Sequence, residues 1–138
     1  MIVADSTYLV DALLSERVSF DDGGVITPNL AVYEVANAIF VRERILHLSG
    51  AGERYLGAFF RAIDASVVEL VDLSEGLMRD AYEIAVRNQA AIYDCVFVAL
   101  CLKTGLRLET RDPAQMKILE RERTRLPVSP AKEESRQR

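Results

Sequence analysis

The chain has 138 residues, a formal net charge of −4 and a hydrophobic content of 50%. These values fit one soluble globular domain and argue against a protein coated with basic residues, although a local basic patch is compatible with them. No apolar stretch reaches the roughly 18 residues of a membrane-spanning helix, and no basic segment precedes the apolar N-terminus as it would in a signal peptide. We therefore expect no membrane association and a cytoplasmic location.

Apolar runs and turn residues predict alternating strands and helices along the chain. Strands are expected at 1–5, 25–27, 66–73 and 106–110, and helices at 6–14, from near Pro28 to about 46, at 51–64, 75–88 and 94–103, and from Pro113 onward. Gly105 is expected to end the helix before it as a C-cap. Residues 126–128 are a candidate terminal strand, and the polar tail 129–138 is expected to be disordered. This alternation predicts an α/β fold with a parallel sheet covered on both faces.

Four acidic residues adjoin apolar runs: Asp5, Glu34, Asp94 and Asp112. An ionised carboxylate near a core is costly unless it is paired, hydrogen-bonded or bound to metal. Asp5 closes the first strand and Asp112 follows the strand at 106–110, so both project into one cleft if those strands are adjacent. Four such acids suggest a metal site, and oxygen ligands without His or Cys favour Mg²⁺ or Mn²⁺ over zinc.

These acids also have structural explanations. Asp5, Asp94 and Asp112 all stand where a helix N-cap is expected. Glu34 is different because it lies within a predicted helix, and Asn37 shares its face three residues later. No buried Lys or Arg partner for Glu34 can be identified from the sequence, so a functional role is favoured for this residue.

The remaining reactive side chains suggest structural roles. Cys95 and Cys101 are six residues apart in an apolar helical run, on different faces, and are expected to be buried and unpaired. His47, the single histidine, lies near the end of a predicted helix, where a structural role is favoured over chemistry.

Taken together, these motifs resemble PIN-domain ribonucleases, in particular the VapC-type toxins of toxin–antitoxin pairs. The likeness covers about residues 1–128 and rests on the order and spacing of four short motifs: Asp5-Ser6-Thr7 after the first strand, Glu34 with Asn37 in a long helix, Asp94 opening an apolar helix, and Thr110-Arg111-Asp112 after a strand. The resemblance implies a three-layer α/β/α sandwich with a four- to five-stranded parallel sheet. It also implies an Mg²⁺-dependent endoribonuclease, in which Mn²⁺ can substitute, that forms a homodimer and binds a small antitoxin protein.

The resemblance also implies roles for individual residues. Asp5, Glu34, Asp94 and Asp112 match the acids that bind one or two divalent ions. In the hydrolysis we expect, Asp5 and Asp94 hold the principal Mg²⁺, while Glu34 and Asp112 complete the cluster and orient the attacking water. The matching supporting polar positions are Ser6 or Thr7, Asn37 and Thr110.

RNA contact requires positive charge near the cleft. Arg111, next to Asp112, is the best candidate for a phosphate contact by proximity. Arg42, Arg44, Arg54 and Arg61 could form a basic rim, although a solvated charged surface is the simpler interpretation for any one of them.

Two other functions remain open. The first is a PIN-like module that binds protein or RNA without significant nuclease activity; Tyr55, Phe59 and Phe60 could serve its interface, although the core is the preferred interpretation. The second is a phosphoaspartate receiver or an aspartyl phosphatase. It fits less well, because Asp5 lacks a second aspartate two residues later and the middle strand offers acids only in weaker positions (Glu69 and Asp72). No glycine-rich phosphate loop is present.

Overall fold

The computed structural model describes residues 1–15, 20–46 and 50–125 of the chain. His47, the candidate strand at 126–128 and the polar tail lie outside these residues. In chain order the elements are β1 (Ile2–Ala4), α1 (Ser6–Leu14), β2 (Val25–Pro28), α2 (Leu30–Leu46), α3 (Ala51–Asp64), β3 (Val68–Val71), α4 (Glu75–Asn88), α5 (Ile92–Thr104), β4 (Leu108–Glu109) and α6 (Pro113–Arg125).

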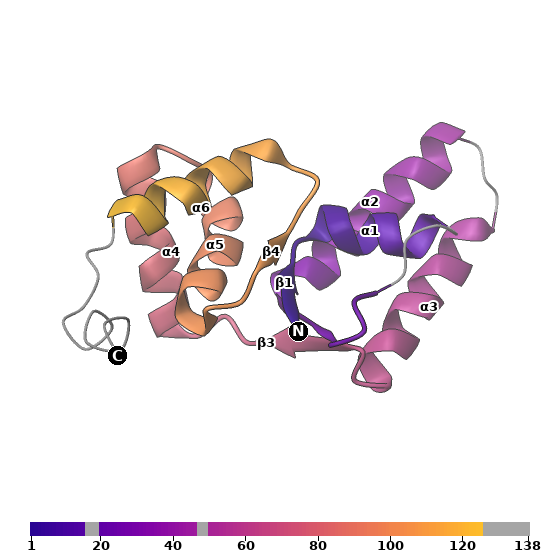
Figure 1. Cartoon of the computed structure of the whole chain (residues 1–138). Coiled ribbons are helices and arrows are strands. Elements are labelled where there is room, and N and C mark those ends of the chain that lie inside the picture. The colour runs from indigo at the N-terminus through magenta and orange to yellow at the C-terminus, as the bar shows by residue number, and fades with distance from the viewer. Residues whose placement is uncertain (16–19, 47–49, 126–138) are drawn as a thin grey trace.

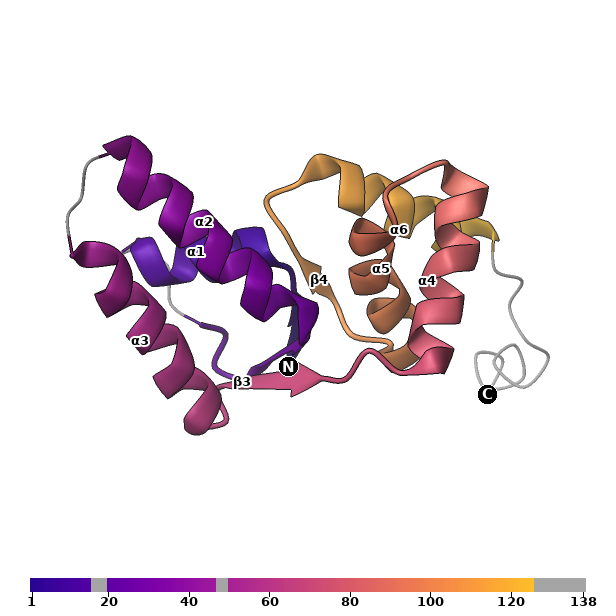
Figure 2. The ribbon, with the colours of Figure 1, turned by 180° about the vertical axis from the view of Figure 1, so that it is seen from behind.

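The strands form one parallel sheet in the order β3-β2-β1-β4. Helices α1, α2 and α3 lie on one side of this sheet and α4, α5 and α6 on the other, as two opposite views show (Figures 1 and 2). All residues of β1 and β2 are buried, as expected for strands covered on both faces. The predicted three-layer α/β/α sandwich is therefore confirmed, with four strands in the described part of the chain.

The strand order brings the two ends of the domain together. From β1 the chain moves outward through β2 to β3, and it then returns by way of α4 and α5 to place β4 on the opposite side of β1. In open parallel sheets, ligands bind beyond the carboxyl ends of the strands where the direction of winding reverses. Here that point lies at the carboxyl ends of β1 and β4, which carry Asp5 and the segment leading to Asp112.

Helix α5 forms the centre of one layer. It packs against β1, β2 and β4, and its residues from Cys95 to Cys101 are all buried. Both cysteines are free and buried, as predicted. Gly105 follows with a φ of 73°, the left-handed conformation that glycine adopts most easily, which confirms it as the C-cap of α5.

None of the described helices is by itself long and apolar enough to cross a membrane. The helices α4 and α5 together meet the length and composition of a span, with a bend of 116° between them.

The end of β2 differs from its prediction. Pro28, expected near the start of the long helix, is the last residue of β2, and α2 begins at Leu30. Pro28 is aligned with Val71 of β3. On the β1 side, continuation of the ladder would bring an N–H from residue 28 to the carbonyl of Ala4, and proline has none. The hydroxyl of Thr27 donates to that carbonyl instead, at 2.8 Å.

Strands β3 and β4 are shorter than the segments predicted at 66–73 and 106–110. Both are edge strands with one neighbour each, so their length is limited by that neighbour. The ladder between β4 and β1 comprises only the pairs Val3–Leu108 and Ala4–Glu109. Beyond Glu109 the backbone turns toward α6, and this turn carries the last acidic motif.

The three aromatic residues of α3 are not all in the core. Phe59 is completely buried and Tyr55 packs partly against the core, whereas Phe60 is 45% exposed. The interpretation as core residues is confirmed for the first two and wrong for Phe60.

Candidate active site

Asp5 lies where β1 meets α1. It is the N-cap of α1: its backbone is extended and its Oδ1 accepts a hydrogen bond from the N–H of Tyr8 at 3.0 Å. The structural explanation of this residue is therefore correct as far as it goes. Asp5 is nevertheless only 1% exposed, and a cap at a surface helix end does not require such burial.

Two threonine hydroxyls hold the same carboxylate. Thr7 Oγ1 donates to Oδ1 of Asp5 at 2.6 Å, and Thr110 Oγ1 donates to Oδ2 at 2.6 Å. Each hydroxyl also accepts a backbone N–H from the turn after β4, at 2.8 Å from Arg111 to Thr7 and at 2.9 Å from Asp112 to Thr110. The two predicted supporting residues therefore fix the orientation of Asp5 and join the start of α1 to the turn before α6.

Glu34 lies on α2 with its carboxylate turned inward. Its Oε1 is buried and has no hydrogen-bond partner within the described chain. Burial, followed by the negative charges of Asp5 and Asp94, raises the pKa of Glu34 to about 7, and a hydrogen bond with the Ser6 side chain offsets only part of this rise. Near neutral pH, Glu34 can therefore either hold or release a proton.

Asp94 is the third residue of α5. The N-cap of this helix is Ala91, which makes no side-chain capping bond, so Asp94 is not a cap. Burial raises its pKa; a hydrogen bond from Gln115 Nε2 to Oδ1 at 3.3 Å opposes this, and the charges of Asp112 and Asp5 raise the pKa further.

Asp112 stands directly before α6. Its Oδ1 accepts a hydrogen bond from the N–H of Ala114 at 2.9 Å, which is the bond that an N-cap makes. Asp112 is also close enough to Asp94 for its charge to raise the pKa of that carboxyl. Capping and membership of the acidic cluster thus coexist at Asp112, as they do at Asp5.

The four acids repel one another, and none of them forms an ion pair with a cationic side chain in the described residues. No three of the described Asp, Glu, His or Cys side chains are arranged as a finished ligand set. The cluster consequently lacks positive charge, and the unpartnered Oε1 of Glu34 is the atom where this lack is most evident. A divalent cation that prefers oxygen ligands, such as Mg²⁺ or Mn²⁺, fits this chemistry.

The other candidate residues are not all near the acids. Asn37 is exposed on α2, and no hydrogen bond joins it to the described acids. Arg111 points toward α1: its Nε donates to Asp11 Oδ2 at 2.9 Å and its guanidinium carbon lies 5.6 Å from the centre of the Tyr8 ring. The four arginines of the proposed rim are all exposed, and of these Arg42 lines a cavity beside the acids.

Sequence reasoning missed Gln115. It is 3% exposed on α6, donates to Asp94, and leaves its own Oε1 buried without a partner among the described atoms. The signal was present in the sequence, because Ile118 and Leu119 follow at helical spacing and place Gln115 on the buried face of α6. A buried amide beside a carboxylate indicates a site.

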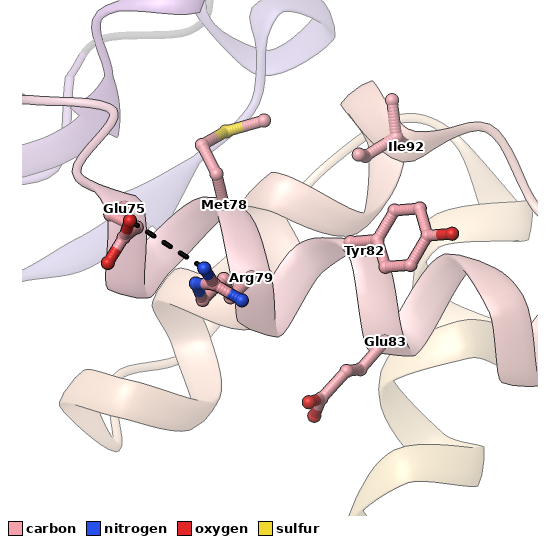
Figure 3. A pocket seen from close by; sticks show the side chains of 6 residues that line it. All are labelled: Glu75, Met78, Arg79, Tyr82, Glu83 and Ile92. Carbon is pink, nitrogen blue, oxygen red and sulfur yellow. Dashed lines mark ion pairs between the residues drawn. The ribbon is translucent and has the colours of Figure 1, made fainter.

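The largest cavity is distant from the acids in the fold. Its volume is about 590 Å³ and it is lined by side chains of α4 and the first residue of α5: Glu75, Met78, Arg79, Tyr82, Glu83 and Ile92 (Figure 3). Glu75 and Arg79 form an exposed ion pair at 3.7 Å across its rim. None of the four acids lines this cavity, so its size is no indication of the chemical site.

A parallel α/β domain with carboxylates gathered beyond the carboxyl ends of β1 and β4 is a domain suited to divalent-metal chemistry. The family model of the PIN domain matches residues 2–120, and the chain belongs to this family. No curated protein matched the sequence.

Two solved structures resemble this fold. One is Mycobacterium tuberculosis VapC20, described as a toxin that cleaves the sarcin–ricin loop; the TM-score is 0.63 at 20% identity, covering 85% of this chain and 94% of that one. The other is PAE2754 from Pyrobaculum aerophilum, with a TM-score of 0.64 at 18% identity, covering 90% of this chain and 93% of that one. At these identities the likeness concerns the fold.

Proposed function

We propose that this chain is a metal-dependent endoribonuclease that hydrolyses RNA phosphodiester bonds, and that it is the VapC-type toxin of a type II toxin–antitoxin pair. The observation that carries the proposal is the acidic cluster, in which the described carboxylates have no cationic partner and Glu34 keeps a buried, unpartnered oxygen. Membership of the PIN family supports nuclease chemistry, and the likeness to VapC20 supports RNA as the substrate.

The proposed cofactor is Mg²⁺, for which Mn²⁺ can substitute. When bound, such an ion activates water and stabilises negative charge on the departing oxygen. Asp5 and Asp94 are the proposed principal ligands: Asp5 is fixed by two hydroxyls, and Asp94 stands at the N-terminal turn of α5, where a negative charge is stabilised by the helix dipole.

Glu34 and Asp112 are proposed to complete the cluster and to orient the attacking water. Because the pKa of Glu34 is raised to about 7, its free Oε1 can accept a proton from water near neutral pH and return it later. The oxygen of that water forms a bond to phosphorus, and the bond from phosphorus to the 3′ oxygen breaks. The hydroxyls of Thr7 and Thr110 serve to hold Asp5 during this step.

The proposed partners are a small antitoxin protein and a second copy of the chain, in the cytoplasm. Exposed apolar side chains on α2 and α4 support protein contacts: Tyr33, Phe40 and Ile45 are 73%, 58% and 67% exposed, and Tyr82 and Val86 are 62% and 61% exposed.

The second candidate function is a PIN-like module that binds RNA or protein without significant cleavage. The observation that favours it is that Asp5 and Asp112 both cap helices, while no finished ligand set exists among the described side chains.

Cleavage of a labelled mixed RNA pool distinguishes the two functions. The purified protein is incubated with Mg²⁺, with Mn²⁺ or with EDTA, beside Asp94→Asn. The matched control is Asp80→Asn, which makes the same change at an exposed position of α4. We expect cleavage that requires the metal, survives in the control and disappears in Asp94→Asn.

Cleavage by all three proteins at equal rates would reveal a contaminating nuclease. Absence of cleavage by the wild-type protein, freed of any antitoxin by denaturation and refolding, would favour the binding module.

A further inference from the structure

A cavity of about 340 Å³ opens between α1, α2 and the turn after β4. Its lining combines hydroxyls, two small apolar side chains and charged groups: Ser6, Thr7, Val10, Asp11, Ala38, Arg42 and Arg111. The two arginines outnumber the single aspartate, so this cavity, which we call the α1–α2 groove, has a net positive lining in a chain of net charge −4.

The groove is continuous with the acidic cluster. Ser6 lines it and shares a hydrogen bond with Glu34, and Thr7 lines it and donates to Asp5 at 2.6 Å. A strand that places one phosphate at the acids therefore carries its neighbouring phosphates past these two hydroxyls into the groove.

Helix α2 aligns the same two regions. Glu34, Ala38 and Arg42 follow one another at intervals of four residues, so they share one face of the helix. Arg42 stands about 12 Å along the helix axis from Glu34, given a rise of about 1.5 Å per residue. One face of α2 thus presents a carboxylate to the cluster and a guanidinium to the groove.

Arg111 is already oriented on the opposite wall. Its Nε is engaged by Asp11 at 2.9 Å, and its guanidinium lies 5.6 Å from the centre of the Tyr8 ring. A guanidinium held through Nε and an aromatic ring keeps its terminal nitrogens available, and these are suited to binding phosphate in a bidentate manner. Asp11 is therefore a positioning residue for Arg111.

We infer that the α1–α2 groove binds a phosphate that flanks the scissile bond of single-stranded RNA, with Arg42 and Arg111 as its two ligands. This inference rests on the proposed nuclease function and specifies where the strand runs from the acids. Backbone contacts of this kind fix the register of a nucleic acid without reading its sequence.

The test measures binding of a fluorescent single-stranded RNA to an Asp94→Asn background, in which the strand is proposed to stay intact. Arg42→Gln and Arg111→Gln are compared with Arg121→Gln, which removes the same charge from an exposed position of α6, in the other helical layer. We expect each groove variant to weaken binding about tenfold, as for loss of a charge-assisted contact, and to reduce the salt dependence by about 0.7 per phosphate. Arg121→Gln is expected to change neither quantity.

The location of the contact is tested with oligonucleotides in which one phosphate at a time is replaced by an uncharged methylphosphonate. One position beside the scissile bond should weaken binding to the background protein but not to either groove variant. Asp11→Asn should also lose this positional effect; an aspartate that merely repelled RNA would leave the effect intact when neutralised.

Equal effects of Arg42→Gln, Arg111→Gln and Arg121→Gln would overturn the inference, and so would a positional effect that persists in the groove variants. Loss of antitoxin affinity without loss of RNA affinity would assign the groove to the protein partner instead. Cleavage by the otherwise wild-type protein is measured in parallel: if RNA is cut but the groove variants behave like the control, the inference fails while the nuclease function stands. If RNA is neither cut nor bound, the proposed function itself fails.

Discussion

Replacing Glu34 with glutamine should stabilise the metal-free protein, although it removes a site residue. In the folded chain the pKa of Glu34 rises from 4.5 to about 7, because the carboxylate is buried and faces Asp5 and Asp94. The folded state therefore binds a proton more tightly than the unfolded state. Ionised Glu34 lowers the free energy of unfolding as pH rises from about 4.5 to about 7, and the full loss is present above that range.

The size of this effect follows from the same two pKa values. The difference between 4.5 and about 7 corresponds to at most about 3 kcal/mol. Glu34 is only half-buried and water screens part of the interaction, so we expect a gain of roughly 1–2 kcal/mol for Glu34→Gln at pH 8. Little gain is expected at pH 4, where glutamate is protonated in both states.

The assay is urea unfolding in EDTA at pH 5, 6.5 and 8. Glu120→Gln, which removes a charge from an exposed position of α6, serves as the matched control. Adding Mg²⁺ at pH 8 should stabilise the wild-type protein more than Glu34→Gln, because binding to the folded state raises its stability. A gain that is independent of pH, or a loss of stability at pH 8, would refute the assignment of Glu34 to a repelling acidic cluster.

Three further substitutions test other parts of the structure. Thr110→Val removes a hydroxyl donor from the buried carboxylate of Asp5, so we expect a loss of about 2 kcal/mol in urea unfolding and at least tenfold slower RNA cleavage; unchanged cleavage would contradict its positioning role. Glu122→Gln breaks a buried pair with Arg87 at 2.6 Å and should cost roughly 3 kcal/mol in thermal unfolding at pH 7. Because that pair and its hydrogen bonds outweigh burial and lower the pKa of Glu122, the difference between variant and wild type should shrink as pH falls below about 4.5. Gly105→Ala meets no neighbouring atom but holds φ at 73°, so a loss of about 1 kcal/mol is expected, and a loss near zero would show that the C-cap relaxes.

The layers and the acids could be predicted because both depend on local patterns. Apolar runs that end on an acid mark the carboxyl ends of buried strands, and this placed Asp5 and Asp112 at one edge of the sheet before the pairing of β1 with β4 was known. The exact length of β4 could not be predicted, because it depends on how far β1 extends beside it rather than on its own residues.

The site's supporting contacts were less accessible to prediction. Thr7 and Thr110 were recognised as polar neighbours, but nothing in their spacing shows that both hydroxyls engage Asp5. The pairing of Arg111 with Asp11 joins residues 100 positions apart, so it depends on the tertiary arrangement. Pro28 was misplaced because proline suits both a first helical turn and a strand end, and the choice depends on Thr27 satisfying the Ala4 carbonyl.

The bonds from Thr110 and from the backbone of Arg111 and Asp112 to the start of α1 have a consequence for the timing of synthesis. Asp5 is among the first residues to leave the ribosome, whereas its second hydroxyl donor follows 105 positions later. A nascent chain therefore cannot complete its acidic site until β4 has emerged and paired with β1, nearly at the end of translation. An enzyme that would act on the RNA of its own host is thereby kept inert while it is still attached to the ribosome that makes it.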